Sequence, residues 1–251
     1  MKKTISWHYQ WIKDILNGKK GYINFLLILI GTLIAGFSIY KPEHFYGNVI
    51  SIIQNDYFLI CVFITYGLNT INISNYILKN EYFVIRQKSY ISLINETQKK
   101  VFLANIINLI LILMIISFVS IIFSFGRLKF FELSTFNIYI FKICFNVSKL
   151  FLVCNILSYI LYYINIIFEK NTVNYIFIVF ILFFSLSLAI NPHNTVTNFF
   201  NIPYIFSWCL ATFQYNTFSL ELYSFIMHFI IIVLIYIILS KYAMKYRGDF
   251  N

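Results

Sequence analysis

The chain has 251 residues, of which 60% are hydrophobic and only 11% are charged. A soluble domain carries about 25% charged residues, so this composition excludes an ordinary soluble protein. A net charge of +10 can indicate nucleic acid binding, but in so apolar a chain we interpret it as the excess of Lys and Arg typical of cytoplasmic loops, with no nucleic acid partner. Apolar segments use up nearly the whole length, so we expect a single transmembrane domain over residues 1–251.

The first 21 residues predict a helix that lies on the membrane surface. Apolar positions fall near one helical face, Trp7 and Trp11 lie beside it, and lysines occupy the rest. This combination is typical of an interfacial helix. An ordinary basic tail is the alternative. No small-residue cleavage pattern comes after it, so we expect no cleavable signal peptide.

Six apolar segments are long enough to cross a bilayer, for which a helix needs about 20 residues. In chain order the expected spans are residues 22–40, 57–78, 101–125, 146–168, 173–190 and 222–240. Barrel strands are only about 9–11 residues long and alternate in polarity, so these runs predict helices. The expected fold class is an all-α integral membrane protein with six transmembrane helices.

The connections between these spans carry the polar and basic residues. Residues 41–56 are expected to form a loop that contains Pro42 and Gly47, and residues 169–172 a tight turn. Residues 136–145 either approach the fourth span along the interface or extend its helix. Most of the 19 Lys and Arg residues fall at the N-terminus, in 79–100, at 170 and in the C-terminal tail, which would share one side. The positive-inside rule makes that side cytoplasmic, with both termini there and the chain in the cell membrane.

Residues 80–100 form the most informative connection. Its apolar and small side chains approximate one helical face, made by Tyr82, Ile85, Ser89 and Leu93. Glu81 and Arg86 fall mostly outside that face. An amphipathic helix needs a surface to pack against. The segment is therefore either a docking helix for a partner subunit or a helix that lies on the membrane.

The order of these elements resembles the permease subunits of type-2 ABC exporters. In that family the loop after the second span often starts with an acidic-aromatic pair, followed by an amphipathic coupling helix and a basic approach to the third span. Glu81-Tyr82, the face through Leu93 and Lys99-Lys100 match this order. The small pair common after the acidic residue is replaced here by Val84-Ile85. Within the family, peptide or bacteriocin exporters and immunity transporters of low-GC Gram-positive bacteria are the most similar in kind.

The resemblance implies a non-catalytic transport subunit that exports a hydrophobic or amphipathic substrate such as a peptide. It implies a second permease subunit, identical or different, and a separate cytoplasmic ABC ATPase that binds ATP and Mg. The ATPase would dock on Glu81, Tyr82, Ile85, Arg86, Ser89 and Leu93. Spans one, two and five would line the dimer axis. Residues 191–221, which contain no Lys or Arg and are divided by Pro203, would supply an outer re-entrant segment before the last helix.

Polar side chains inside the spans allow two interpretations. Thr65, Asn69 and Asn72 share one face of the second span, where they either hold helices together or line a translocation path. Lys142 and Lys149 are seven residues apart before and within the fourth span. They either snorkel to the outer headgroups or form a cationic patch at an outer mouth, where Glu221 could pair with Lys149.

Sequence motifs bear on the enzyme question. The chain has no GxxxxGK[ST] phosphate-binding loop, which assigns ATP binding to a partner, and no HExxH or GxSxG motif. Its four cysteines form no CxxC pair, so we expect no metal site and no cofactor in this chain. Two rival hypotheses remain open: an ATP-independent membrane binding or immunity protein, and an intramembrane enzyme that uses Glu221 and His228.

Overall fold

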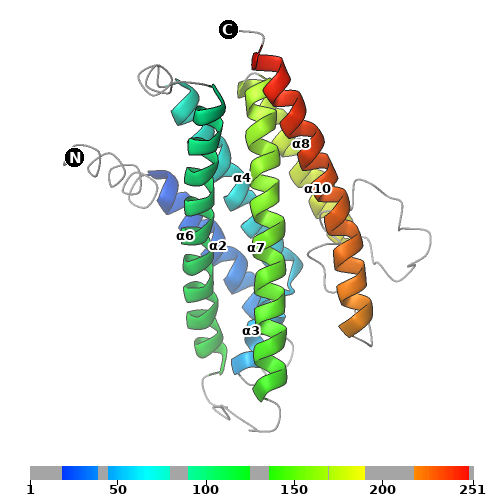
Figure 1. The fold of residues 1–251 in the computed structure, drawn as a ribbon. Helices are drawn as coiled ribbons and strands as arrows, with labels where there is room; N and C mark the ends of the chain where they lie inside the picture. Colours follow the sequence, from blue (N-terminus) through cyan, green and yellow to red (C-terminus); the bar gives the residue numbers. More distant parts are fainter. Residues whose placement is uncertain are drawn as a thin grey trace, which may run out of the picture.

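The computed structural model describes residues 19–38, 45–79, 90–124, 136–168, 170–189 and 218–248, and every regular element in these ranges is a helix (Figure 1). In chain order they are α2 (Lys19–Ser38), α3 (Phe45–Ile53), α4 (Asp56–Lys79), α6 (Tyr90–Ser124), α7 (Phe136–Ile167), α8 (Lys170–Ala189) and α10 (Phe218–Gly248). The predicted interfacial helix and the re-entrant segment fall almost wholly outside these ranges.

Five of these helices, α2, α4, α6, α7 and α10, are long and apolar enough to cross a membrane. Helix α8 has 20 residues and contributes a shorter apolar stretch, Thr172–Leu182. Large apolar side chains such as Phe37 and Phe118 are exposed on the outside of the bundle. Such surfaces are unfavourable in water and suit lipid. The chain is therefore a helical membrane protein with five or six helices able to span a bilayer.

Exposed tyrosines lie near the ends of the helices. Helix α4 carries Tyr57 near its start and Tyr76 near its end, both more than half exposed. At 1.5 Å per residue they are about 29 Å apart along the helix, close to the ~30 Å thickness of the hydrocarbon core. Tyr22 and Tyr242 occupy similar places in α2 and α10. Tyrosines favour this membrane–water boundary, so they mark the depth of the bilayer on the bundle.

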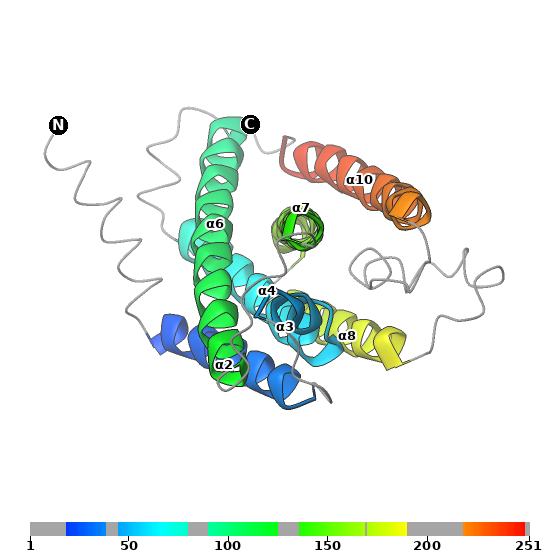
Figure 2. The ribbon, with the colours of Figure 1, turned by 90° about the horizontal axis from the view of Figure 1, so that it is seen from below.

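Helices α4 and α7 form the centre of the bundle. In each of these two helices 67% of the apolar, membrane-length stretch is buried inside the bundle. The corresponding share is 33% for α2 and α6 and 6% for α10. Helix α4 packs against α2, α6, α7 and α8, and α7 packs against α10, α3 and α6 as well (Figure 2). The residues at these helix contacts build one large hydrophobic core. It includes Phe58 and Val62 of α4, Ile112 of α6, and Val153 and Leu157 of α7.

Two glycines let neighbouring helices approach closely. A Cβ added to Gly31 of α2 would lie 2.7 Å from the Cβ of Cys61 in α4. A Cβ on Gly67 of α4 would overlap the ring of Phe177 in α8. Small residues at helix interfaces serve this purpose in membrane proteins, where close van der Waals packing drives association.

The loop predicted over residues 41–56 is wrong for most of its length, because it contains α3. This short helix is apolar and buries Val49, Ile52 and Ile53 between the longer helices. Gly47, a residue typical of loops, lies buried inside α3. Asn55 then starts α4: its Oδ1 accepts a hydrogen bond from the backbone N–H of Tyr57 at 3.0 Å, which caps the helix.

Other boundaries differ from the prediction in an informative way. Helix α6 begins at Tyr90 rather than near Val101, so residues 90–100 belong to the same helix as the third span. Helix α7 is continuous from Phe136, so the residues before the fourth span extend its helix. Helix α8 starts at Lys170, so the predicted turn over 169–172 begins and ends earlier. The remaining span boundaries agree to within a few residues for α2, α4 and the start of α10.

Candidate functional site

The basic residues of the described helices gather at one end of the bundle, which we call the basic end. Helices α2, α6 and α8 begin there, and α4, α7 and α10 end there (Figure 1). The basic residues at this end are Lys19, Lys20, Lys79, Lys99, Lys100, Lys170, Lys241, Lys245 and Arg247. Away from the basic end, the described ranges contain only Lys142, near the start of α7, and Lys149, near its middle.

The predicted docking segment is described only from Tyr90 onward. Glu81, Tyr82, Ile85, Arg86 and Ser89 lie outside the described residues. Leu93 is 2% exposed and packs with Ile73, Ile77, Val101 and Ala104, between α4 and α6. Its side chain therefore belongs to the packing of the bundle and not to the outer surface of α6.

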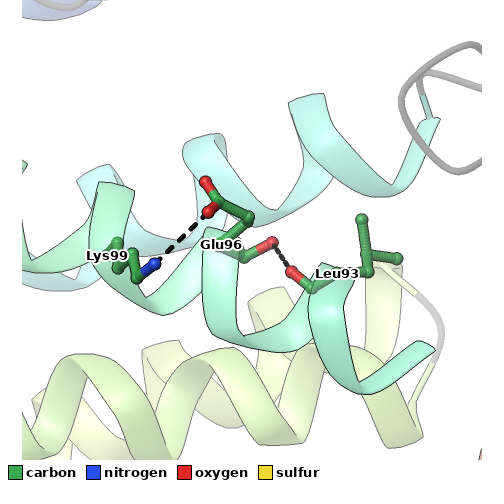
Figure 3. A network of polar contacts seen from close by, with 4 residues as sticks. Leu93, Glu96 and Lys99 are labelled. Atoms are coloured by element: carbon green, nitrogen blue, oxygen red, sulfur yellow. Dashed lines mark hydrogen bonds and ion pairs between the residues drawn. The ribbon is translucent and has the colours of Figure 1, made fainter. Parts of the chain in front are cut away.

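The outer surface at the start of α6 is polar. Lys99 Nζ lies 3.4 Å from Glu96 Oε1, and both side chains are exposed (Figure 3). Asn95 is exposed on the same part of the helix. A hydrogen bond from the Thr97 hydroxyl to the Leu93 carbonyl, 2.8 Å, fixes the turn between them. The start of α6 thus presents charge outward while Leu93 holds it against α4.

Two of the three predicted path residues lie inside the bundle. Thr65 is fully buried, and its hydroxyl donates to the Cys61 carbonyl of its own helix at 2.8 Å. Asn69 is 4% exposed, and its Oδ1 accepts a hydrogen bond from Asn24 Nδ2 of α2. Asn72 is partly exposed. For Thr65 and Asn69 this placement favours helix packing over the lining of a path at the surface of the chain.

Hydrogen bonds between polar side chains or backbone groups join α4, α6 and α7 at several depths. Asn105 of α6 donates to Asn155 Oδ1 of α7 at 2.8 Å, and the Tyr66 hydroxyl of α4 donates to the Asn105 carbonyl at 3.2 Å. Nearer the basic end, Asn165 of α7 donates to Ser74 Oγ of α4. In membrane proteins such a bond contributes about 0.6 kcal/mol on average, and up to about 1.7.

A row of polar side chains on α7 has a position that sequence reasoning missed. Asn155, Tyr159 and Tyr163 are spaced four residues apart, and we call them the α7 polar stripe. Gln98 Nε2 of α6 donates to the Tyr163 hydroxyl at 2.6 Å. The Tyr236 ring of α10 lies 6.1 Å from the Tyr159 ring and 5.8 Å from that of Tyr163. The four-residue spacing is visible in the sequence, but the facing residues on α6 and α10 are not.

The two lysines in the first half of α7 have different environments. Lys142 is exposed, as expected of a snorkelling side chain, and its carbonyl accepts a hydrogen bond from Asn146 at 2.9 Å. Lys149 is only 3% exposed, and its Nζ lies 5.5 Å from the centre of the Phe145 ring, a cation–π contact. Lys149 is therefore held within the protein.

The predicted pair of Glu221 and Lys149 remains a prediction, since only the backbone of Glu221 is described. The rings of Phe145 and Phe225 lie 6.3 Å apart and set the register of α7 and α10, which run parallel (Figure 1). Glu221 is four residues before Phe225, and Lys149 is four residues after Phe145. Their backbones are thus about 12 Å apart along the helices, and an ion pair must span that separation.

Chemistry-bearing side chains are scattered in the part of the chain that the structure describes. No group of three His, Cys, Asp or Glu residues there could hold a metal ion. Cys61, Cys144 and Cys154 have free thiols; Cys144 is exposed, Cys61 is half-buried and Cys154 is buried. His228 lies in α10, at a position where only the backbone is described.

No protein-family model matches this chain, and neither a curated protein nor a solved structure shows significant similarity to it. The resemblance to exporter permeases is therefore one of element order and of a few residues. Transport and the partners that this resemblance implies are therefore proposals.

Proposed function

We propose that this chain is the transmembrane permease subunit of an ATP-driven ABC exporter. The observation that carries the proposal is the start of α6. Along α6, Phe102 is the first large apolar side chain that is described as exposed. The helix therefore has about 18 Å, Tyr90–Val101, before its exposed apolar part begins. Among the side chains that the structure describes in that part, the exposed ones are Asn95 and Lys99, both polar. A polar start of α6, next in the chain to residues 80–89, would offer a soluble ATPase a place to attach.

In this proposal the basic end faces the cytoplasm. Lys and Arg are enriched on that side of membrane proteins, and each one near an anionic leaflet contributes about 1 kcal/mol of attraction. Because α2 begins and α10 ends at the basic end, the proposal has both termini in the cytoplasm and the chain in the cell membrane. The ATPase would then meet residues 80–89 and the start of α6 without crossing the bilayer.

Helix α6 would carry the motion of the ATPase across the membrane. It has 35 uninterrupted residues, about 52 Å of helix. At its far end Ser124 Oγ accepts a hydrogen bond of 3.0 Å from Asn48 of α3. Two permease subunits and two ATPases would form the transporter. ATP binding would draw the ATPases together, shift both copies of α6, and move α3 at the outer end.

The proposed substrate is hydrophobic or amphipathic, and a peptide is the expected class. The buried polar groups of the described helices are mainly amides and hydroxyls, with Lys100 and Lys149 as the buried charges. Thr65 and Asn69 are enclosed within the chain, so the peptide class rests on the resemblance to peptide exporters and not on groups that the structure exposes.

One observation favours a second candidate, an ATP-independent binding or immunity protein. Thr65 and Asn69, two of the three predicted path residues, are enclosed by the helices of a single chain. A protein that binds a partner within the membrane needs no path at its surface. Dependence on an ATPase separates the two candidates.

The docking proposal is tested by comparing two variants for retention of the ATPase. Tyr82→Asp combined with Ile85→Asp places charge on the predicted docking face, and we expect the ATPase to be lost while the permease remains folded. Leu93→Ala is the matched control: it lies in the same segment but faces α4, so it should lower thermal stability and keep the ATPase. Retention of the ATPase by the double aspartate variant would contradict docking on this segment.

A further inference from the structure

The outward face of α10 combines an apolar run with two lysines. Ile230, Leu234 and Ile238 follow one another at four-residue spacing and are 49%, 52% and 66% exposed. Lys241 and Lys245 continue the same side of the helix toward the basic end, and both are exposed. Residues three or four apart on a helix are neighbours, so these five side chains form one strip, which we call the α10 outer strip.

The α10 outer strip faces away from the rest of the bundle. Ile232 and Ala243, the two described side chains of α10 that are fully buried, lie on the opposite face of the helix. Ala243 packs with Ile94 of α6 and Ile166 of α7, which fixes the direction of that buried face near the basic end. Helix α10 runs along the edge of the bundle (Figure 2). The apolar part of the strip is therefore a surface for lipid.

The strip has the length of one leaflet of the bilayer. At 1.5 Å per residue, Ile230 and Lys241 are about 16 Å apart along α10, and half of a hydrocarbon core of ~30 Å is ~15 Å. Tyr242, 57% exposed, marks the membrane boundary between the two lysines. Lys241 and Lys245 thus lie at the depth of the lipid headgroups, and the apolar run lies at the depth of the acyl chains.

No carboxylate among the described side chains balances the two lysines. Glu96 lies 3.4 Å from Lys99, and Asp56 is at the start of α4, at the opposite end of the bundle. Neither Lys241 nor Lys245 forms an ion pair with a residue that the structure describes. Like charges four residues apart on a helix repel each other, so an anion that contacts both is favoured. At headgroup depth the anions are lipid phosphates.

We propose that the α10 outer strip binds an anionic phospholipid in preference to a zwitterionic one. The acyl chains lie along Ile230, Leu234 and Ile238, and the phosphate contacts Lys241 and Lys245. The apolar run distinguishes a lipid from free phosphate, which would use the lysines alone. A zwitterionic lipid carries a cation in its headgroup, which offsets the attraction. The proposal does not depend on the exporter function and applies equally to a binding protein.

Fluorescence quenching at one position of the strip tests the proposal. Leu234→Trp is made in the full chain with its three native tryptophans replaced by phenylalanine, and the protein is reconstituted in bilayers. Brominated phosphatidylglycerol and brominated phosphatidylcholine quench tryptophan on contact, so the ratio of their quenching gives the relative affinity of this position for the two lipids. The usual attraction of one lysine to anionic headgroups corresponds to about a fivefold preference, so we expect phosphatidylglycerol to be preferred at least about fivefold.

Two double variants with the same change in net charge provide the matched comparison. Lys241→Gln with Lys245→Gln should abolish the preference for phosphatidylglycerol. Lys99→Gln with Lys142→Gln removes two exposed lysines outside the strip and should leave the preference unchanged. All four side chains are exposed, so both variants should keep the fold.

Three results would overturn the proposal. An equal loss of preference in both double variants would show general attraction to a basic surface instead of a site on α10. The absence of any preference in the parent chain would show that the two lysines only extend into water. If neither brominated lipid quenched the tryptophan, protein such as a second copy of the chain would cover the strip in place of lipid.

Discussion

The hydrogen bond between Asn24 of α2 and Asn69 of α4 gives a quantitative prediction. Asn24 donates to Asn69 Oδ1, while Asn69 Nδ2 has no partner among the described residues. Asn24→Leu removes the donor and leaves both polar atoms of Asn69 unpaired in a buried position. Asn69→Leu removes the same bond and leaves Asn24 Nδ2 without its acceptor, but it also removes the Asn69 Nδ2 group that was already unsatisfied. The two single substitutions should therefore differ in cost.

The magnitudes come from the bond and from desolvation. The lost bond contributes about 0.6 kcal/mol and at most about 1.7 kcal/mol in a membrane protein, and an unpaired buried acceptor costs about 1–3 kcal/mol more. We expect Asn24→Leu to lower the free energy of unfolding by about 2 kcal/mol and Asn69→Leu by less than about 1 kcal/mol. The double substitution should cost less than Asn24→Leu, because no unpaired amide then remains, whereas Asn69→Leu alone leaves Asn24 Nδ2 without an acceptor.

Reversible unfolding of the purified chain in mixed micelles, with increasing denaturing detergent, measures all four proteins. The coupling energy from this double-mutant cycle isolates the pair. Strict additivity, or a larger cost for Asn69→Leu than for Asn24→Leu, would refute the packing role assigned to these asparagines. If transport falls only in proportion to the folded fraction, Asn69 holds helices together and does not line a path.

The same unfolding assay tests three further contacts. Gly67→Ala should destabilise the chain by about 1–3 kcal/mol, because the new methyl overlaps the Phe177 ring, and adding Phe177→Ala should recover part of that loss; no recovery would contradict the close approach of α4 and α8. Tyr66→Phe should cost about 0.6 kcal/mol through its lost bond to α6, whereas Tyr76→Phe at the exposed end of α4 should cost nothing measurable. Asn48→Ala should cost about 1 kcal/mol by releasing α3 from Ser124, and an unchanged midpoint would show that α3 is held without this bond.

The transmembrane helices could be predicted because lipid imposes one strong rule. A segment that crosses the hydrocarbon core must satisfy its backbone internally and expose apolar side chains, so length and hydropathy alone reveal it. Helix α3 was not predicted in this way, because its nine residues are too few to span the hydrocarbon core. The early start of α6 was missed for a related reason: Glu96, Lys99 and Lys100 end the hydropathy signal, but they are good helix formers and do not end the helix.

The facing of polar residues could not be predicted, because it depends on which helices become neighbours. Thr65, Asn69 and Asn72 share a face in the sequence, yet the structure encloses the first two and leaves the third partly exposed. The contacts of Asn155 and Tyr159 could not be predicted, because their partners Asn105 and Tyr236 lie on other helices, α6 and α10. Leu93 shows the converse, since a face that suggested docking supplies a core contact at that position.

Co-purification of the tagged wild-type chain from its native membrane, in mild detergent, tests the central proposal most directly. The exporter account predicts a stoichiometric partner that binds and hydrolyses ATP, together with a second permease subunit, identical or different. Isolation of a folded, monodisperse chain with no ATPase would contradict that account and leave the ATP-independent binding protein as the better explanation.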